Sequence, residues 1–235
     1  MQRPEVPGKL YVHGAGNGYF RDGAALWGRI REAFGRQAFP PRTEAGKTIQ
    51  LQAQYVPTDG SLPLNLIFLE MAGEDLREVM ITDAGGKALP FHILQFLKIP
   101  RLKISFLVMT AWSDAARDDE TIDDFLSFLN EEAPHLIDNR FILLITKWDT
   151  KPKSSGSIDD FVRANMPSTY SKLAAARNVI QPFSIGEVVS IKDAGEDIIA
   201  SFDYASSQRL FRRIYETFTG VPSEAPTAAW WQFWK

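Results

Sequence analysis

Four consecutive residues, Thr146-Lys147-Trp148-Asp149, have the side chains and spacing that most clearly suggest chemistry. They have the form Asn/Thr-Lys-x-Asp and directly follow the apolar run 141–145. In this arrangement the carboxylate of Asp149 can accept hydrogen bonds from the N1 and N2 donors of guanine, a pair that adenine lacks, while the stem of Lys147 covers the base edge. The pattern predicts a guanine-recognition loop after a buried strand. A surface loop with no ligand is the competing interpretation.

A second pattern, Glu70-x-x-Gly73, follows the apolar segment 64–69. A carboxylate at a strand tip can reach magnesium through water, and a glycine lets a backbone N–H approach a phosphate. Thr43 is a hydroxyl in a polar loop after two prolines, which is an ordinary structural position. No residue is assigned to catalysis.

The elements that must position these residues alternate between strand and helix patterns. Apolar runs or polar alternation predict strands over 10–12, 48–56, 64–69, 104–109, 141–145 and 185–191. Helical spacing predicts helices over 23–37, 158–178 with a break at Pro167, and a last helix that is capped by Ser206 or Ser207 and stops at Gly220. The alternation in 48–56 indicates a half-buried antiparallel or edge strand, whereas 104–109 is predicted to be fully buried. The expected fold is a three-layer α/β sandwich with a mainly parallel central sheet, which binds ligands at the carboxyl ends of its strands.

In order and spacing, these patterns resemble the small-GTPase-like domains of the P-loop GTPase superfamily. Residues 70–73 are similar to the family's Asp-x-x-Gly motif, and 146–149 to its Asn-Lys-x-Asp motif. Ser184, in Phe-Ser-Ile-Gly, lies where the last base-contacting loop would fall, with Ser190 as a rival. The segments 40–43 and 182–189 look most like the bacterial double-GTPase type. The resemblance implies GTP or GDP as ligand, magnesium as cofactor, and partner proteins that contact the loops around Thr43 and Gly73. It also implies that Thr43 is the candidate switch threonine that closes over the magnesium ion held through Glu70.

The sequence departs from that family at the phosphate-binding loop. It contains no Gly-x-x-x-x-Gly-Lys-Ser/Thr, whose backbone and lysine hold the phosphates. The segment 45–48 has Pro41 where the first glycine belongs and leads into a strand. The segment 14–18 is either a degenerate phosphate loop or an ordinary turn, with the true loop before Met1. Two hypotheses follow: a GTPase-related switch or scaffold component, or a nucleotide-independent interaction subunit of a multiprotein complex. Hydrolysis is left undecided.

Composition limits the domain organisation, partners and chemistry that either hypothesis can include. The 235 residues, 45% of them hydrophobic, suffice for one α/β domain over 1–222, followed by a Trp-rich tail over 223–235. A net charge of -3 gives no reason to expect a nucleic-acid surface. The chain has no cysteine, which excludes disulfides, thiolate chemistry and cysteine-bound zinc. A cytoplasmic, soluble protein without a bilayer-spanning segment is expected.

The tail contains four aromatic residues within five positions, 230–234. Exposing so much aromatic surface to water is unfavourable, so the tail is expected to dock. The candidate surfaces are its own domain, a protein partner in a homo- or hetero-oligomer, and last a membrane interface, for which Lys235 is the only cation nearby.

Overall fold

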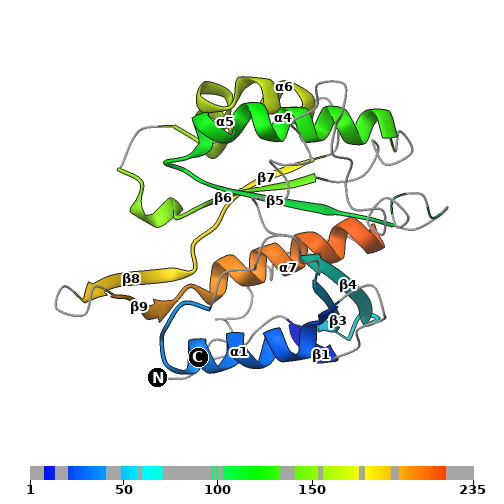
Figure 1. Ribbon diagram of the computed structural model, residues 1–235. Coiled ribbons are helices and arrows are strands. Elements are labelled where there is room, and N and C mark those ends of the chain that lie inside the picture. Colours follow the sequence, from blue (N-terminus) through cyan, green and yellow to red (C-terminus); the bar gives the residue numbers. More distant parts are fainter. Residues whose placement is uncertain are drawn as a thin grey trace, which may run out of the picture.

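The structure is a computed structural model and is drawn in Figure 1. It describes residues 8–13, 21–40, 49–57, 60–70, 97, 99, 103–132, 141–152, 156–174, 178–191 and 196–220. The segments 14–18 and 45–48, the candidate residues Thr43 and Gly73, and the tail 223–235 lie outside these residues.

The described elements combine helices with three sheets, so the fold class is α/β. In chain order they are β1 (Gly8–His13), β2 (Arg21–Asp22), α1 (Gly23–Gly35), β3 (Ile49–Pro57), β4 (Leu64–Glu70), β5 (Phe106–Ala111), α4 (Ala115–Glu132), β6 (Phe141–Thr146), η2 (Trp148–Thr150), α5 (Ile158–Asn165), α6 (Pro167–Ala174), β7 (Val179–Pro182), β8 (Gly186–Ile191), β9 (Glu196–Phe202) and α7 (Tyr204–Thr219).

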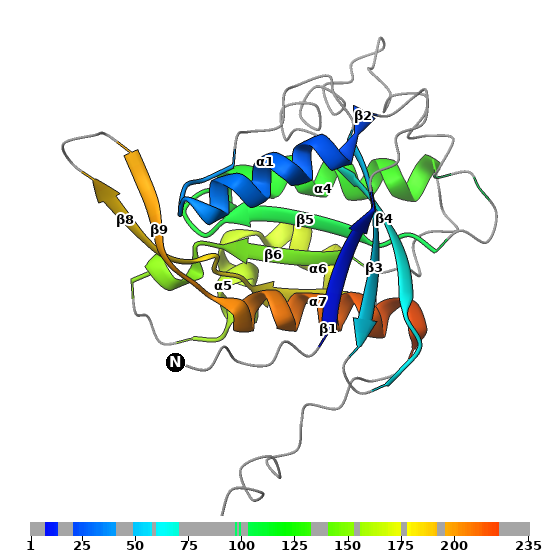
Figure 2. The same ribbon diagram turned by 90° about the horizontal axis from the view of Figure 1, so that it is seen from below.

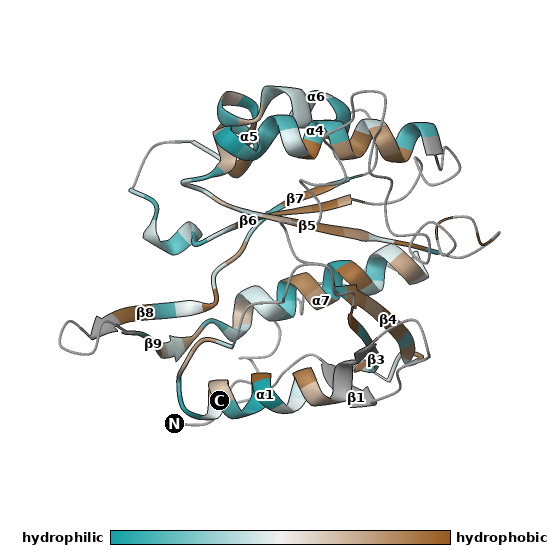
Figure 3. Ribbon diagram, in the orientation of Figure 1, coloured by the Kyte–Doolittle hydropathy of each residue, from teal (hydrophilic) through white to brown (hydrophobic). Residues whose placement is uncertain are grey.

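A parallel sheet of three strands, in the order β5-β6-β7, forms the centre of the molecule. Its middle strand β6 is apolar and buried along almost its whole length, as the continuous apolar run predicts. Helices α4, α5 and α6 lie on one side of this sheet and α7 on the other (Figure 1). Leu143 and Ile145 pack in the cluster with α4, α5 and α6, while Ile142 and Leu144 pack against α7. Figure 3 shows the same division, with hydrophobic strands inside and largely hydrophilic outer helices.

The N-terminal strands form a separate sheet, which corrects the expectation of one mainly parallel sheet. β3 pairs antiparallel with both β1 and β4, and only the two-residue β2 runs parallel to it. The alternation in 48–56 correctly predicts an antiparallel strand, although β3 is central in its sheet rather than at an edge. The physical reason is that the glutamines of β3 interrupt the continuous apolar run that is typical of parallel strands covered on both faces.

A two-stranded antiparallel hairpin, β8–β9, extends from the C-terminal half of the chain (Figure 2). β8 agrees with the strand predicted over 185–191, but its partner β9 was not predicted. The third parallel strand β7 was also missed. The end of α1 holds the hairpin, because Ile199 N–H donates to the carbonyl of Gln37 at 2.6 Å and the ring of Phe34 meets that of Phe202 edge-on at 5.3 Å.

One buried carboxylate joins two helices on the outer face. Asp119 of α4, only 9% exposed, accepts hydrogen bonds from the backbone N–H groups of Ser168 and Thr169 at 3.2 and 2.9 Å. These groups open α6, so the side chain caps a helix 50 residues away in sequence. Among the described helices, none is long and apolar enough to cross a membrane.

Candidate functional site

A cleft of about 530 Å³ lies beyond the carboxyl ends of β6 and β7. This volume falls within the roughly 300–1,000 Å³ range of small-molecule sites. The cleft receives residues from the turn after β6, from the loop after β7, from both strands of the hairpin and from the start of α7. The lining residues are Asp149, Thr150, Ser184, Gly186, Glu187, Val188, Ser201, Phe202 and Asp203. Two sequence-predicted site residues, Asp149 and Ser184, therefore share one cleft.

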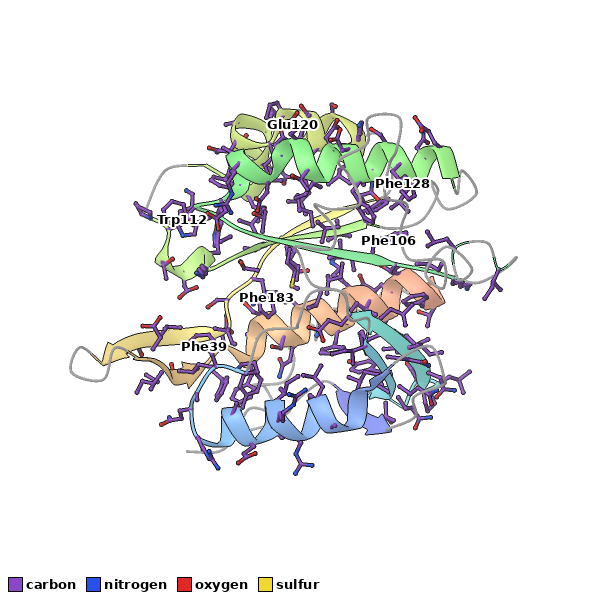
Figure 4. The ribbon with its side chains drawn as sticks, viewed as in Figure 1. Phe39, Phe106, Trp112, Glu120, Phe128 and Phe183 are labelled. Atoms are coloured by element: carbon purple, nitrogen blue, oxygen red, sulfur yellow. The ribbon has the colours of Figure 1, made fainter. Side chains whose placement is uncertain are left out.

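The turn that carries Asp149 is held by several hydrogen bonds. Lys147 adopts a left-handed backbone conformation with φ 55°. Its carbonyl then accepts from the backbone N–H of Thr150 at 3.0 Å and from the Thr150 hydroxyl at 2.8 Å. The indole Nε1–H of Trp112, labelled in Figure 4, donates to the same hydroxyl at 3.0 Å. These contacts fix the position of Asp149 at the mouth of the cleft.

The other residues of the predicted guanine loop support the turn and do not line the cleft. Thr146 joins two strands, since its hydroxyl donates to the carbonyl of Thr110 at 3.2 Å. Lys147 is exposed. Trp148 packs edge-on against Phe161 at 5.3 Å, and the ammonium group of Lys151 lies 4.9 Å from the centre of the indole ring. Of the predicted set, Asp149 alone faces a ligand-sized space.

Ser184 forms the opposite wall and is connected to the same turn. Phe183, labelled in Figure 4, donates its N–H to the carbonyl of Ile145 at 2.9 Å and accepts from the N–H of Trp148 at 3.4 Å. Ser184 is 8% exposed, and its hydroxyl oxygen accepts from the N–H of Gly186 at 3.0 Å. The relative position of Ser184 and Asp149 is therefore set by backbone hydrogen bonds between neighbouring strands.

Asp203 closes the cleft at the start of α7. As N-cap residue it accepts from the backbone N–H of Ser206 at 3.0 Å and from its hydroxyl at 2.6 Å. Burial acts to raise the pKa of Asp203, but the hydrogen bonds from Ser206 and the charge of Arg209 outweigh it and lower the pKa below its usual value. This carboxylate is charged at neutral pH.

The charge of the lining is negative. Three carboxylates, those of Asp149, Glu187 and Asp203, line the cleft, and none of the described lining residues is a lysine or arginine. Such a lining favours hydrogen-bond donors and positive charge, and it disfavours phosphate groups.

Of the two predicted metal residues, Glu70 lies within the described part of the chain, and it does not line this cleft. Glu70 ends β4 in the antiparallel sheet, is exposed, and is not among the lining residues. Thr43 and Gly73 lie outside the described residues. Within the described part of the chain, no three His, Cys, Asp or Glu side chains are grouped to hold a metal ion.

The hairpin and the cap of α7 supply most of the cleft residues that sequence reasoning missed, Phe202 and Asp203 among them, and the turn after β6 supplies Thr150. One available signal was Asp203 itself, since aspartate is a preferred N-cap residue and it stands directly before the helical segment. The cap predicted at Ser206 or Ser207 was therefore wrong by three or four residues, and Ser206 is the donor to the true cap.

The described residues form an α/β fold with an open cleft where two parallel strands end, and ligands usually bind at such ends in α/β sheets. Comparison with protein-family models, with curated proteins and with solved structures gave no match.

Proposed function

We propose that this chain binds a guanine nucleoside or nucleotide in the cleft and acts as a GTPase-related switch or scaffold component through partner proteins. The observation that supports this proposal most directly is that Asp149 and Ser184 line the same cleft. Both residues are candidates on their sequence motifs alone, and they lie on separate segments 35 positions apart.

In this proposal Asp149 reads the base. Its carboxylate accepts hydrogen bonds from the N1 and N2 groups of guanine, two donors that match two acceptor oxygens. Adenine presents an acceptor at N1 and has no 2-amino group, so it would leave the carboxylate unpaired, which is unfavourable. The hydroxyl oxygen of Ser184 accepts a hydrogen bond from the N–H of Gly186. Its O–H can still donate a hydrogen bond to the carbonyl of the base.

The finer fold assignment is part of the same proposal. A GTPase-like three-layer sandwich is supported by the placement of α4, α5 and α6 on one side of the parallel sheet and α7 on the other. Within that arrangement GTP or GDP is the proposed ligand, and Glu70, Thr43 and Gly73 are the residues that would hold magnesium and the terminal phosphate.

The acidic lining favours recognition of the base over recognition of the phosphates. With Asp149, Glu187 and Asp203 in the cleft, the phosphates of a bound nucleotide would have to point away from it. We therefore expect guanosine to bind at least as well as GTP in the absence of magnesium. The proposal assigns no hydrolytic step to this chain.

Isothermal titration calorimetry tests the proposal. Guanosine, GDP and GTP, with and without magnesium, and adenosine as the control ligand are titrated into the wild-type chain, Asp149→Ala and Glu187→Gln. Glu187→Gln removes one negative charge from the same cleft and so controls for a general electrostatic effect. Asp149→Ala should lose at least about 3 kcal/mol, on the order of 100-fold in Kd, because two hydrogen bonds to a charged group disappear.

Two results would count against the proposal. One is no binding of any guanine ligand to a sample that circular dichroism shows to be folded. The other is an equal loss in Asp149→Ala and Glu187→Gln, which would mean that charge, and not base reading, controls the cleft.

The second candidate function is a nucleotide-independent interaction subunit of a multiprotein complex. The observation that favours it is the acidic lining of the cleft, where Asp149, Glu187 and Asp203 disfavour the phosphates of a nucleotide. If every nucleotide fails to bind the folded chain, this becomes the better account of the protein.

A further inference from the structure

One face of β5 is incompletely covered, although the apolar sequence of the strand predicts full burial. Phe106 and Val108 pack against the cluster beneath α4, on the covered face. On the other face Leu107 and Met109 are 37% and 62% exposed. Parallel strands are normally covered on both faces, so this surface is unusual for its position.

The exposed residues continue an apolar surface that is buried on the neighbouring strand. In the sheet register Leu107 lies beside Ile142 and Met109 beside Leu144. Ile142 and Leu144 are 1% and 0% exposed because α7 packs over them. The apolar face thus extends sideways from beneath α7, and a segment lying alongside α7 would complete its cover.

The C-terminal end of α7 lies next to the start of this face. The ammonium group of Lys103, three residues before β5, donates to the carbonyl of Phe218 at 3.0 Å. Helix α7 then ends at Gly220, whose left-handed conformation with φ 71° turns the chain out of the helix axis. The tail therefore leaves the described structure beside the beginning of β5.

The tail is long enough to reach the exposed residues. Trp230 lies ten residues beyond Gly220, a span of at most about 33–36 Å when extended. Leu107 and Met109 lie four and six residues beyond Lys103, about 13 and 20 Å along an extended chain. A tail that reverses direction after α7 can place its aromatic residues under both.

We propose that the Trp-rich tail, residues 223–235, folds back alongside α7 and covers Leu107 and Met109 of β5. Trp230, Trp231, Phe233 and Trp234 supply the apolar surface, since each aromatic side chain can bury about 150–250 Å². The thioether of Met109 adds favourable contact with an aromatic ring. The lone Lys235 gives little attraction to anionic lipid, so the protein's own apolar face is the better match.

The absence of cysteine from the chain allows a direct test by disulfide cross-linking. Met109→Cys is combined with Gln232→Cys, which leaves all four tail aromatics in place. The matched control is Leu62→Cys with Gln232→Cys. Leu62 is 83% exposed, and its carbonyl accepts from the hydroxyl of Tyr215 at 3.1 Å, so it too lies beside α7 near the base of the tail.

Both pairs are oxidised at low micromolar protein, and the intramolecular bond is followed by intact mass and gel mobility. The 109–232 pair should close on the order of tenfold faster than the 62–232 pair, because docking raises the effective concentration at one site above that of a free tether. Replacing Trp230, Trp231, Phe233 and Trp234 with Ser in the 109–232 pair should reduce its rate to that of the control.

Three outcomes would overturn the proposal. Equal rates for the two pairs would mean a tail that does not dock on β5, and a faster 62–232 pair would mean docking elsewhere. Disulfide-linked dimers in place of the intramolecular bond would assign the surface to a second copy of the chain.

Discussion

Gly186, at the first residue of β8, allows the close approach of the hairpin strands that form one wall of the cleft. Its φ of 130° lies in a region that residues with a side chain rarely adopt. A Cβ atom there would lie 1.8 Å from the carbonyl oxygen of Ser201 and 2.8 Å from the Cα of Phe202. Both neighbours are backbone atoms of β9, so the substitution Gly186→Ala must push the two strands apart.

The magnitude follows from these distances. Contacts under 3.0 Å are essentially never seen for real Cβ atoms, so the Ser201 carbonyl has to retreat by more than 1 Å. Backbone strain of this kind costs about 1–3 kcal/mol and overpacking a further 1–3 kcal/mol, which predicts a loss of about 2–6 kcal/mol in the free energy of unfolding. That is a large share of the roughly 5–15 kcal/mol stability of a typical domain.

Urea unfolding followed by circular dichroism measures this loss, and Gly28→Ala is the control. Gly28 lies in α1, where an added Cβ meets nothing within 4 Å. Alanine there should stabilise the protein by about 0.5–1 kcal/mol because it is the better helix former. If Gly186→Ala unfolds within about 0.5 kcal/mol of wild type, the range of ordinary surface substitutions, the hairpin strands do not approach each other closely at residue 186 and the reasoning is refuted.

Three further substitutions test the cap, the helix contact and the cleft. The pKa of Asp203 is lowered in the folded state, so the charged side chain stabilises the fold at pH values above the unfolded pKa of about 3.9. This contribution is lost as the pH falls from there through the folded pKa. The Tm gap between wild type and Asp203→Asn should therefore be constant from about pH 5 to 7 and close in more acidic buffer; a gap that persists there would contradict the linkage. Asp119→Ala should cost about 1–2 kcal/mol in urea unfolding through loss of the α6 cap, whereas the exposed Asp124→Ala should change little, and equal effects would refute the role of the cap. Phe202→Leu should weaken guanosine binding in calorimetry by about 1–3 kcal/mol if its ring stacks on the base, and an unchanged Kd would exclude stacking.

The strands that could be predicted from the sequence are those with long apolar runs or strict alternation. β6 is an example, because five consecutive large apolar residues leave little choice but a buried strand. β7 has only four residues, including Gln181 and Pro182, so its sequence has no periodicity that marks a strand. β9 begins with Glu196-Asp197 and likewise gives a weak local signal.

Pairing between strands was less predictable than the strands themselves, since it depends on contacts distant in sequence. β1 pairs with β3 in a register that places His13 opposite Gln52, and nothing in the sequence near β1 indicates that partner. The exposure of Leu107 and Met109 has the same origin. An apolar strand indicates that other elements must pack over it. The position of α7 decides that β6 is covered on this face while Leu107 and Met109 of β5 are not.

In the candidate site, local motifs identified two residues and tertiary structure supplied the rest. Asp149 and Ser184 follow strand-like segments and have recognisable neighbours in the sequence. Glu187, Ser201 and Phe202 line the cleft because the start of β8 and the end of β9 lie beside the turn after β6 and the loop after β7, and this placement has no counterpart in sequence spacing.

The residues proposed for base recognition and the residue proposed for metal binding lie on different sheets. Asp149 and Ser184 follow β6 and β7, which are hydrogen-bonded neighbours, so their spacing is fixed by the sheet. Glu70 is the last residue of β4, which within the described residues pairs only with β3.

The two sheets are connected by side-chain packing instead, because Tyr55 and Leu66 pack with Ile142, Leu144 and α7 in one cluster. Packing of this kind tolerates shifts that a hydrogen-bonded register does not, so the proposed base recognition does not depend on a metal site. Equal affinity for guanosine and for GTP with magnesium would therefore indicate base recognition alone. A clear preference for GTP with magnesium would indicate that the loops around Thr43 and Gly73 complete the site.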